Sequence, residues 1–144
     1  MSSDARSMSG TTAFRLRPTD AADEAVSTLV VDEAAAGRAT VLTYTWHHPD
    51  DGVQGGTLLL GAPAEDGTVT AGWVDSWHQP DVVLLTGTGG AGASSLGYDY
   101  APGWRWEIDV VVETTSVSLV MRNVVPEGHG SPAGPYDVMR ARWS

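Results

Sequence analysis

The chain has 144 residues, a formal net charge of −10 and no cysteine. These values exclude disulfides and thiolate metal sites, and the negative charge argues against binding to nucleic acid or anionic membranes. Hydrophobic residues make up 42% of the sequence, which is enough for one globular domain. Because no apolar run is typical of a signal peptide or a membrane span, we expect a soluble cytoplasmic protein.

The predicted elements follow the chain as short strands separated by turns. Residues 1–10 are small and polar, which predicts a disordered tail before a single domain over residues 11–144. Helical character is limited to a short helix after Pro18 and a turn that ends at Gly37. Strands are predicted at 11–17, 25–33, 38–48, 54–61, 68–77, 81–88, 96–100, 104–113, 117–125 and 136–144.

Alternation of polar and apolar residues is clearest in residues 104–113. One face carries Arg105, Glu107, Asp109, Val111 and Glu113, and the other carries Trp104, Trp106, Ile108, Val110 and Val112. A period of two with one apolar face predicts an antiparallel strand. Residues 117–125 follow the same pattern, with Asn123 as an exception on the apolar face. About eight to ten such strands with short connections predict an all-β fold, namely a single antiparallel up-and-down barrel.

Three segments carry a family resemblance: GTLLLGAPAEDGTVTAGWVDSWHQPDVVLLTG (56–87), GYDYAPGWRWEIDVVV (97–112) and YDVMRARW (136–143). They resemble a group of uncharacterised bacterial proteins with a lipocalin-like barrel of the calycin superfamily. The resemblance covers roughly residues 38–144, and it implies a barrel like those of lipocalins and fatty-acid-binding proteins, with an interior cavity for a lipid or small molecule. Haem-binding barrels of the nitrobindin type are more distant, and their N-terminal Gly/Trp-rich signature is absent here.

Aromatic and polar residues gather in TAGWVDSWHQPDVVLLTG (70–87). Trp73, Asp75 and Trp77 share one face of the predicted strand. If this face is interior, the Asp75 carboxylate needs hydrogen-bond donors such as a Trp N–H, an Arg or a ligand. Turn or strand hydrogen bonds with a purely structural role are the favoured interpretation.

Aromatic residues are also the strongest indication of a binding site. Aromatic walls suit a small apolar ligand, and they suit a filled hydrophobic core equally well. We predict that Asp75 and His78 are the polar residues that anchor the ligand near one rim of the barrel. The candidate ligand-binding residues are Trp46, His48, Trp73, Asp75, Trp77, His78, Trp104 and Trp106.

The sequence offers little support for other sites. A metal site of His47 or His48 with His78 and Asp75 is conceivable, but no zinc motif is present, and we expect neither metal nor cofactor. The segment GTGGAG (87–92) lacks the lysine and helix of a phosphate-binding loop, so it predicts a flexible hairpin or a loop that gates the cavity. An outward row of arginines is favoured over an inward set that binds a carboxylate, and the expected partners of this row are Glu107, Asp109 and Glu113. The arginines are Arg122, Arg140 and Arg142.

Three functions therefore remain open. The favoured one is binding of a small apolar or lipid-like molecule by a monomer or homodimer, with no nucleic acid or membrane partner. The second is an isomerase or hydrolase that uses Asp75 or His78 for acid–base chemistry in the same cavity. The third is a filled, non-catalytic barrel that mediates protein association.

Overall fold

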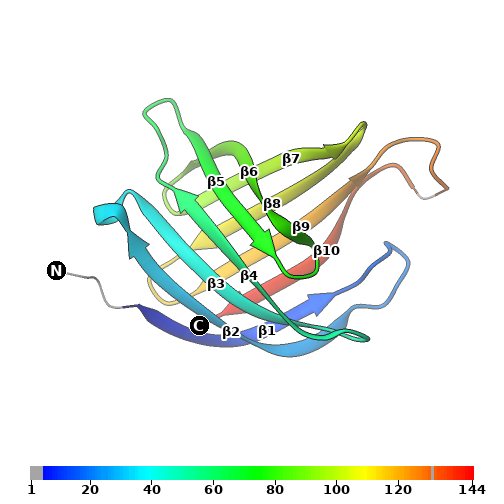
Figure 1. The fold of residues 1–144 in the computed structure, drawn as a ribbon, viewed down its shortest axis with the longest axis horizontal. Helices are drawn as coiled ribbons and strands as arrows, with labels where there is room; N and C mark the ends of the chain where they lie inside the picture. Colours follow the sequence, from blue (N-terminus) through cyan, green and yellow to red (C-terminus); the bar gives the residue numbers. More distant parts are fainter. Residues whose placement is uncertain (1–4, 131) are drawn as a thin grey trace.

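The computed structural model describes residues 5–130 and 132–144, and these ranges contain ten strands and one short 3-10 turn (Figure 1). The strands are β1 (Arg6–Phe14), β2 (Asp23–Ala34), β3 (Ala39–His48), β4 (Gly52–Gly61), β5 (Thr68–Asp75), β6 (Gln79–Gly90), β7 (Ala93–Ala101), β8 (Trp104–Val112), β9 (Val117–Val125) and β10 (Gly134–Trp143). The 3-10 turn, η1 (Ala35–Gly37), joins β2 to β3.

Each strand pairs antiparallel with its neighbour in sequence, and β1 pairs with β10 to close the sheet. Figure 1 shows this closure where the blue first strand lies beside the red last strand. The register places Gly10 opposite Trp143 and Phe14 opposite Met139. The predicted antiparallel up-and-down barrel is confirmed, and closure pairs the two terminal strands that would otherwise be edges.

The two-residue alternation sets which side chains fill the barrel. In β8, Trp106, Ile108 and Val110 are buried, as predicted from their shared face. Large buried side chains occupy the middle of the barrel. Those that are almost completely buried include Tyr44, Trp46, Leu58, Trp73, Ile108, Leu119, Met121, Met139 and Trp143.

The arginines of the last strands lie on the outer surface, as expected. Arg122 forms ion pairs with Glu107 and Asp109, both of which lie on neighbouring β8. Arg140 pairs with Asp137 of its own strand, 3.1 Å away, instead of with the β8 carboxylates. The inward-facing residues at the centre of β9 and β10 are apolar, namely Leu119, Met121 and Met139.

The N-terminal strand begins earlier than predicted. β1 starts at Arg6, within the stretch expected to be a tail, whereas residues 1–4 lie outside the described residues. Met8 faces the core and is 8% exposed, and Ser9 exchanges backbone hydrogen bonds with Ser144. Pairing with both β2 and the C-terminus therefore orders a segment whose composition alone favours disorder.

The two predicted helical segments form turns. The helix expected after Pro18 is absent: the amide of Asp20 donates to the carbonyl of Arg17, and the Asp20 carboxylate accepts from the Arg17 amide. This side-chain hydrogen bond stabilises a turn in place of a helix. The turn predicted to end at Gly37 is η1, with positive φ angles of 51° at Ala35 and 56° at Ala36. Within the described residues, no helical segment has the length and apolar character needed to cross a membrane.

Candidate functional site

Asp75 ends β5 on the inside of the barrel and is completely buried. Its Oδ2 accepts hydrogen bonds from the Tyr44 hydroxyl at 2.6 Å and from Trp46 Nε1 at 3.1 Å. Its Oδ1 accepts the backbone N–H groups of Trp77 and His78, each at 2.9 Å. The carboxylate is therefore fully satisfied by the turn that follows it and by the neighbouring strand β3.

The direction of the hydrogen bond between Tyr44 and Asp75 is fixed by a further donor, Trp73. Trp73 Nε1 donates to the Tyr44 oxygen at 3.0 Å, so the Tyr44 proton points to Asp75. Burial, followed by the charge of Asp75, raises the pKa of Tyr44 well above its usual value. Asp75 thus has protein donors around both oxygens, which supports the structural role favoured from the sequence.

A glycine makes this network sterically feasible. Gly56 of β4 is opposite Tyr44 on one side and opposite Asp75 on the other. A Cβ at Gly56 would overlap the Tyr44 hydroxyl and lie 2.9 Å from Oδ2 of Asp75. The two polar side chains therefore meet across a strand position where only glycine leaves them room.

His48 lies at the end of β3, next to Trp77. Its Nδ1 accepts the backbone N–H groups of Asp50 and Asp51, both at 3.1 Å, and its ring stacks on Trp77 at 4.7 Å. Trp77 Nε1 donates to the Asp51 carboxylate. Residues 5–130 and 132–144 contain no group of three His, Asp or Glu side chains placed to hold a metal, so His48, His78 and Asp75 do not form the conceivable metal site.

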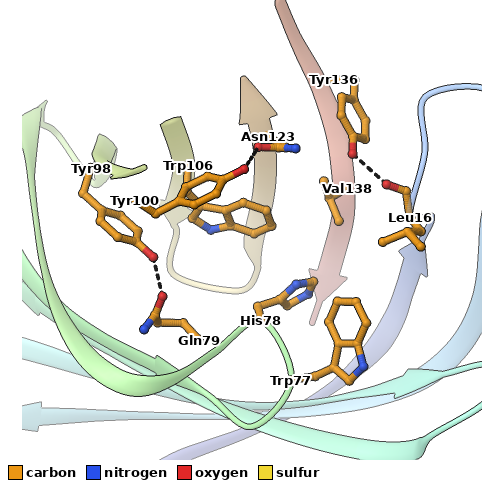
Figure 2. A pocket seen from close by; sticks show the side chains of 10 residues that line it. All are labelled: Leu16, Trp77, His78, Gln79, Tyr98, Tyr100, Trp106, Asn123, Tyr136 and Val138. Atoms are coloured by element: carbon orange, nitrogen blue, oxygen red, sulfur yellow. Dashed lines mark hydrogen bonds between the residues drawn. The ribbon is translucent and has the colours of Figure 1, made fainter. Parts of the chain in front are cut away.

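A pocket of about 210 Å³ lies at this end of the barrel (Figure 2). The turn between β5 and β6, the last residues of β7 and the start of β10 surround it. Its lining is mainly aromatic, with three tyrosines, two tryptophans and one histidine. The lining residues are Leu16, Trp77, His78, Gln79, Tyr98, Tyr100, Trp106, Asn123, Tyr136 and Val138.

The tyrosine hydroxyls of the pocket are already used by the protein. Tyr98 donates to Gln79 Oε1 at 2.5 Å, and Tyr100 donates to Asn123 Oδ1 at 2.5 Å. Tyr136 donates to the carbonyl of Leu16 at 2.6 Å, which ties β10 to the segment after β1. Figure 2 shows these three hydrogen bonds around the pocket. They hold the aromatic rings in place and commit the hydroxyl protons.

Two ring nitrogens of the lining residues lack the hydrogen bonds that the tyrosine hydroxyls have. His78 Nε2 and Trp106 Nε1 are buried and have no hydrogen-bond partner among the described residues. The two rings lie 5.2 Å apart between centroids, and Trp106 is 9% exposed. Burial lowers the pKa of His78 to about 4, and His48 adds to this effect against the opposing charge of Asp75. His78 is therefore a neutral imidazole near pH 7.

The structure places the candidate residues from the sequence in four different surroundings. Trp77, His78 and Trp106 line the pocket. Trp46, Trp73 and Asp75 form the buried layer next to it, and His48 is held by the turn after β3. Trp104 packs on Tyr100 and His129 and is not among the lining residues.

Most of the polar residues that line the pocket have no distinctive signal in the sequence. Asn123 was visible as the exception on the apolar face of its strand, and it accepts the hydrogen bond of Tyr100. Tyr98 lies opposite Trp106 in the β7–β8 register, which a strand pattern alone does not reveal. The other lining residues absent from the prediction are Leu16, Gln79, Tyr100, Tyr136 and Val138.

Comparison with known proteins adds no family to this geometry. No family model matches the chain. A search of curated proteins likewise finds no match. The ten-stranded antiparallel barrel and its terminal pocket are therefore the basis for a functional proposal.

Proposed function

We propose that the protein binds a small, mainly apolar molecule in the pocket at the end of the barrel, as lipocalin-like barrels of the calycin superfamily would. The observation that carries this proposal is the pocket of about 210 Å³ itself, whose lining is mainly aromatic and contains no Asp, Glu, Arg or Lys. Pockets that bind small molecules are lined mainly by hydrophobic and aromatic side chains, with a few polar groups that orient the ligand.

The size of the pocket favours a compact ligand. An apolar cavity of about 150 Å³ holds a benzene ring. The pocket volume of about 210 Å³ accommodates one ring with small substituents, and the packed middle of the barrel leaves little room for a long acyl chain. A single-ring molecule therefore fits better than an extended lipid.

Acid–base catalysis by Asp75 has less support than binding. All four of its hydrogen bonds come from the protein, and it does not line the pocket. A general base must reach the proton that it removes from a substrate. His78 does line the pocket, but its Nε2 atom is buried, which leaves it no proton to exchange with a substrate there.

The test combines an unbiased search with a blocked pocket. Native mass spectrometry of protein purified from its own host would show any compound that co-purifies, and toluene serves as a defined apolar probe in an NMR titration. Leu16 lines the pocket and is 51% exposed, so Leu16→Trp adds bulk there with little effect on folding. The matched control is Leu59→Trp, at a position on the β4 surface that is 46% exposed.

We expect Leu16→Trp to weaken toluene binding at least tenfold, whereas Leu59→Trp keeps the wild-type affinity. Two outcomes would contradict the proposal. One is that no compound co-purifies and no small ring binds. The other is that binding is the same in Leu16→Trp as in the wild type, which would place the ligand elsewhere.

A further inference from the structure

We propose that the outer face of β3–β6 is the contact surface of a homodimer, in which a second copy of the chain covers this face through a twofold axis. This inference goes beyond ligand binding and does not depend on the pocket, which lies at one end of the barrel. It combines three observations: the face is almost without charge, it carries exposed apolar side chains, and it offers an open hole beside a protruding leucine.

The outer surface of the barrel has a charged side and an uncharged side. Strands β8–β10 contain seven charged residues, and three arginines among them form ion pairs with carboxylates. Strands β3–β6, which lie side by side (Figure 1), contain two charged residues, Asp75 and Asp81, and Asp75 is buried. Apart from Asp81, the outer face of these four strands therefore carries no Asp, Glu, Arg or Lys.

Exposed apolar residues gather on the uncharged side. Among the described residues, eight large apolar side chains are exposed, and six of them belong to β2, β4 and β6. Val53 and Leu59 lie on β4, and Val82 and Leu84 lie on β6. Contiguous apolar patches on the surface of soluble proteins mark interaction sites. The face of β3–β6 therefore has the composition of a surface that a partner covers.

A hole next to a protruding side chain makes the face complementary to itself. The strand registers place Leu59, Gly72 and Leu84 in one row across β4, β5 and β6. Because neighbouring strands are about 4.8 Å apart, Gly72 lies between two leucines whose Cα atoms are about 10 Å apart. A Cβ on Gly72 would meet nothing within 4 Å, and Leu84 is 67% exposed beside it. In a twofold dimer, Leu84 of each protomer enters the hole at Gly72 of the other.

Charge decides which face a second copy can cover. Two chains that each carry a net charge of −10 repel each other, and contact through β8–β10 would also bury charged side chains. Contact through β3–β6 leaves the carboxylates of the connecting turns at the rim, in water. These exposed residues are Asp50, Asp51, Glu65 and Asp66. The dimer is therefore held by apolar contact and opposed by repulsion between its acidic rims.

The size of the face matches a weak dimer. Four strands about 4.8 Å apart and about eight residues long cover roughly 500 Å². Two such faces bury up to about 1,000 Å² in total, which is the low end for specific interfaces and typical of transient ones. We therefore expect monomer and dimer to exchange, with the dimer populated at high protein concentration.

Sedimentation equilibrium of the wild-type chain tests the association between about 10 μM and about 1 mM, where weak complexes dissociate. We expect the mean mass to rise with concentration from 15.1 kDa toward twice that value. The dimer should become tighter when NaCl is raised from about 50 mM to about 500 mM, because salt screens the repulsion between the acidic chains. Over the same concentrations, ¹⁵N NMR signals of β3–β6 should shift, and those of β8–β10 should not.

Two variants and one control locate the contact. Leu84→Glu would bury an unpaired carboxylate in the dimer and should weaken it about tenfold or more. Gly72→Leu makes the face more apolar but fills the hole, so a specific dimer should weaken, whereas non-specific adhesion would strengthen. Val26→Glu adds the same charge at an exposed position of β2, outside the face, and should leave the dissociation constant unchanged. A ¹⁵N spectrum of each variant checks that the barrel is intact.

The wild-type measurements alone can overturn the homodimer. A monomer at every concentration and both salt levels would do so, and it would leave the face to a partner of different chemistry. A dimer that weakens with added salt would be held by charge, and assemblies that grow beyond the dimer would not have a closed twofold contact. Either result contradicts the inference. A dimer that survives both Leu84→Glu and Gly72→Leu would place the contact on another surface, which also overturns it.

Discussion

Asp75 and His78 are three residues apart, and their polar groups have opposite environments. Each carboxylate oxygen of Asp75 accepts two hydrogen bonds from protein donors. In contrast, Nε2 of His78 has no hydrogen-bond partner among the described residues. The first arrangement stabilises the turn between β5 and β6, and the second leaves a buried polar atom without a protein partner. The same short segment thus supplies a structural carboxylate and a candidate ligand contact.

Because the pKa of His78 is lowered in the folded protein, we expect the free energy of unfolding to depend on pH. Its pKa is about 4 in the folded protein and 6.5 when unperturbed, so the unfolded chain binds a proton first as the pH falls. The contribution of neutral His78 is complete above pH 6.5 and is lost between about pH 6.5 and 4. From these two values we expect the free energy of unfolding to be about 2 kcal/mol lower at pH 5 than at pH 7.5 from this group.

Urea unfolding of the wild type and of His78→Phe at several pH values measures this contribution. The variant lacks the titrating group and keeps a ring against Trp46, so its stability should change less over the same interval. Identical pH profiles for the two proteins would contradict the assignment of a depressed pKa to His78.

At the scale of elements, three adjacent strands are coupled through one glycine. Gly56 of β4 lies between Tyr44 of β3 and Asp75 of β5. In Gly56→Ala the new methyl group would displace the Tyr44 hydroxyl and disturb a buried network. We expect a loss of about 2 kcal/mol or more in the free energy of unfolding, typical of a broken buried hydrogen-bond network.

A matched substitution controls for the loss of glycine itself. Gly72 of β5 also lies within a strand, and a Cβ there meets nothing within 4 Å. Gly72→Ala should therefore be neutral or slightly stabilising in the same urea experiment. Equal destabilisation by the two substitutions would show that the contact with Tyr44 and Asp75 is not the cause.

The sequence predicts where the strands lie better than it predicts which residues face each other on neighbouring strands. The alternation in residues 104–113 correctly predicts which side of β8 is buried, and the glycines of residues 87–92 correctly predict a hairpin, now seen between β6 and β7. Alternation carries no register, however, so the meeting of Tyr98 with Trp106 could not be predicted. Residues 6–10, the first part of β1, have the composition of a tail, because their order comes from pairing with distant segments.

At the scale of the whole molecule, the barrel wall is not continuously paired beside the pocket. β6 and β7 pair only from Thr86–Gly97 to Gly90–Ala93, so Gln79–Leu85 has a paired strand only on its β5 side. The hydrogen bond from Tyr98 to Gln79 crosses this split, and both residues line the pocket. The packed centre of the barrel and this partly paired wall leave the pocket end as the natural place for local opening.

Hydrogen exchange should report this difference within one sheet. We expect the amides of residues 79–85 that face β7 to exchange faster than the paired amides of residues 86–90, because no backbone acceptor protects them. Tyr98→Phe removes the side-chain link across the split and should increase exchange in 79–85 further, while Tyr100→Phe, whose hydroxyl bonds to Asn123, should not. Uniform protection along β6 would mean that the split does not open in solution. Faster exchange confined to 79–85, and slowed by a bound ring, would instead link the opening to the pocket, because a ligand that binds only the closed wall stabilises it by mass action.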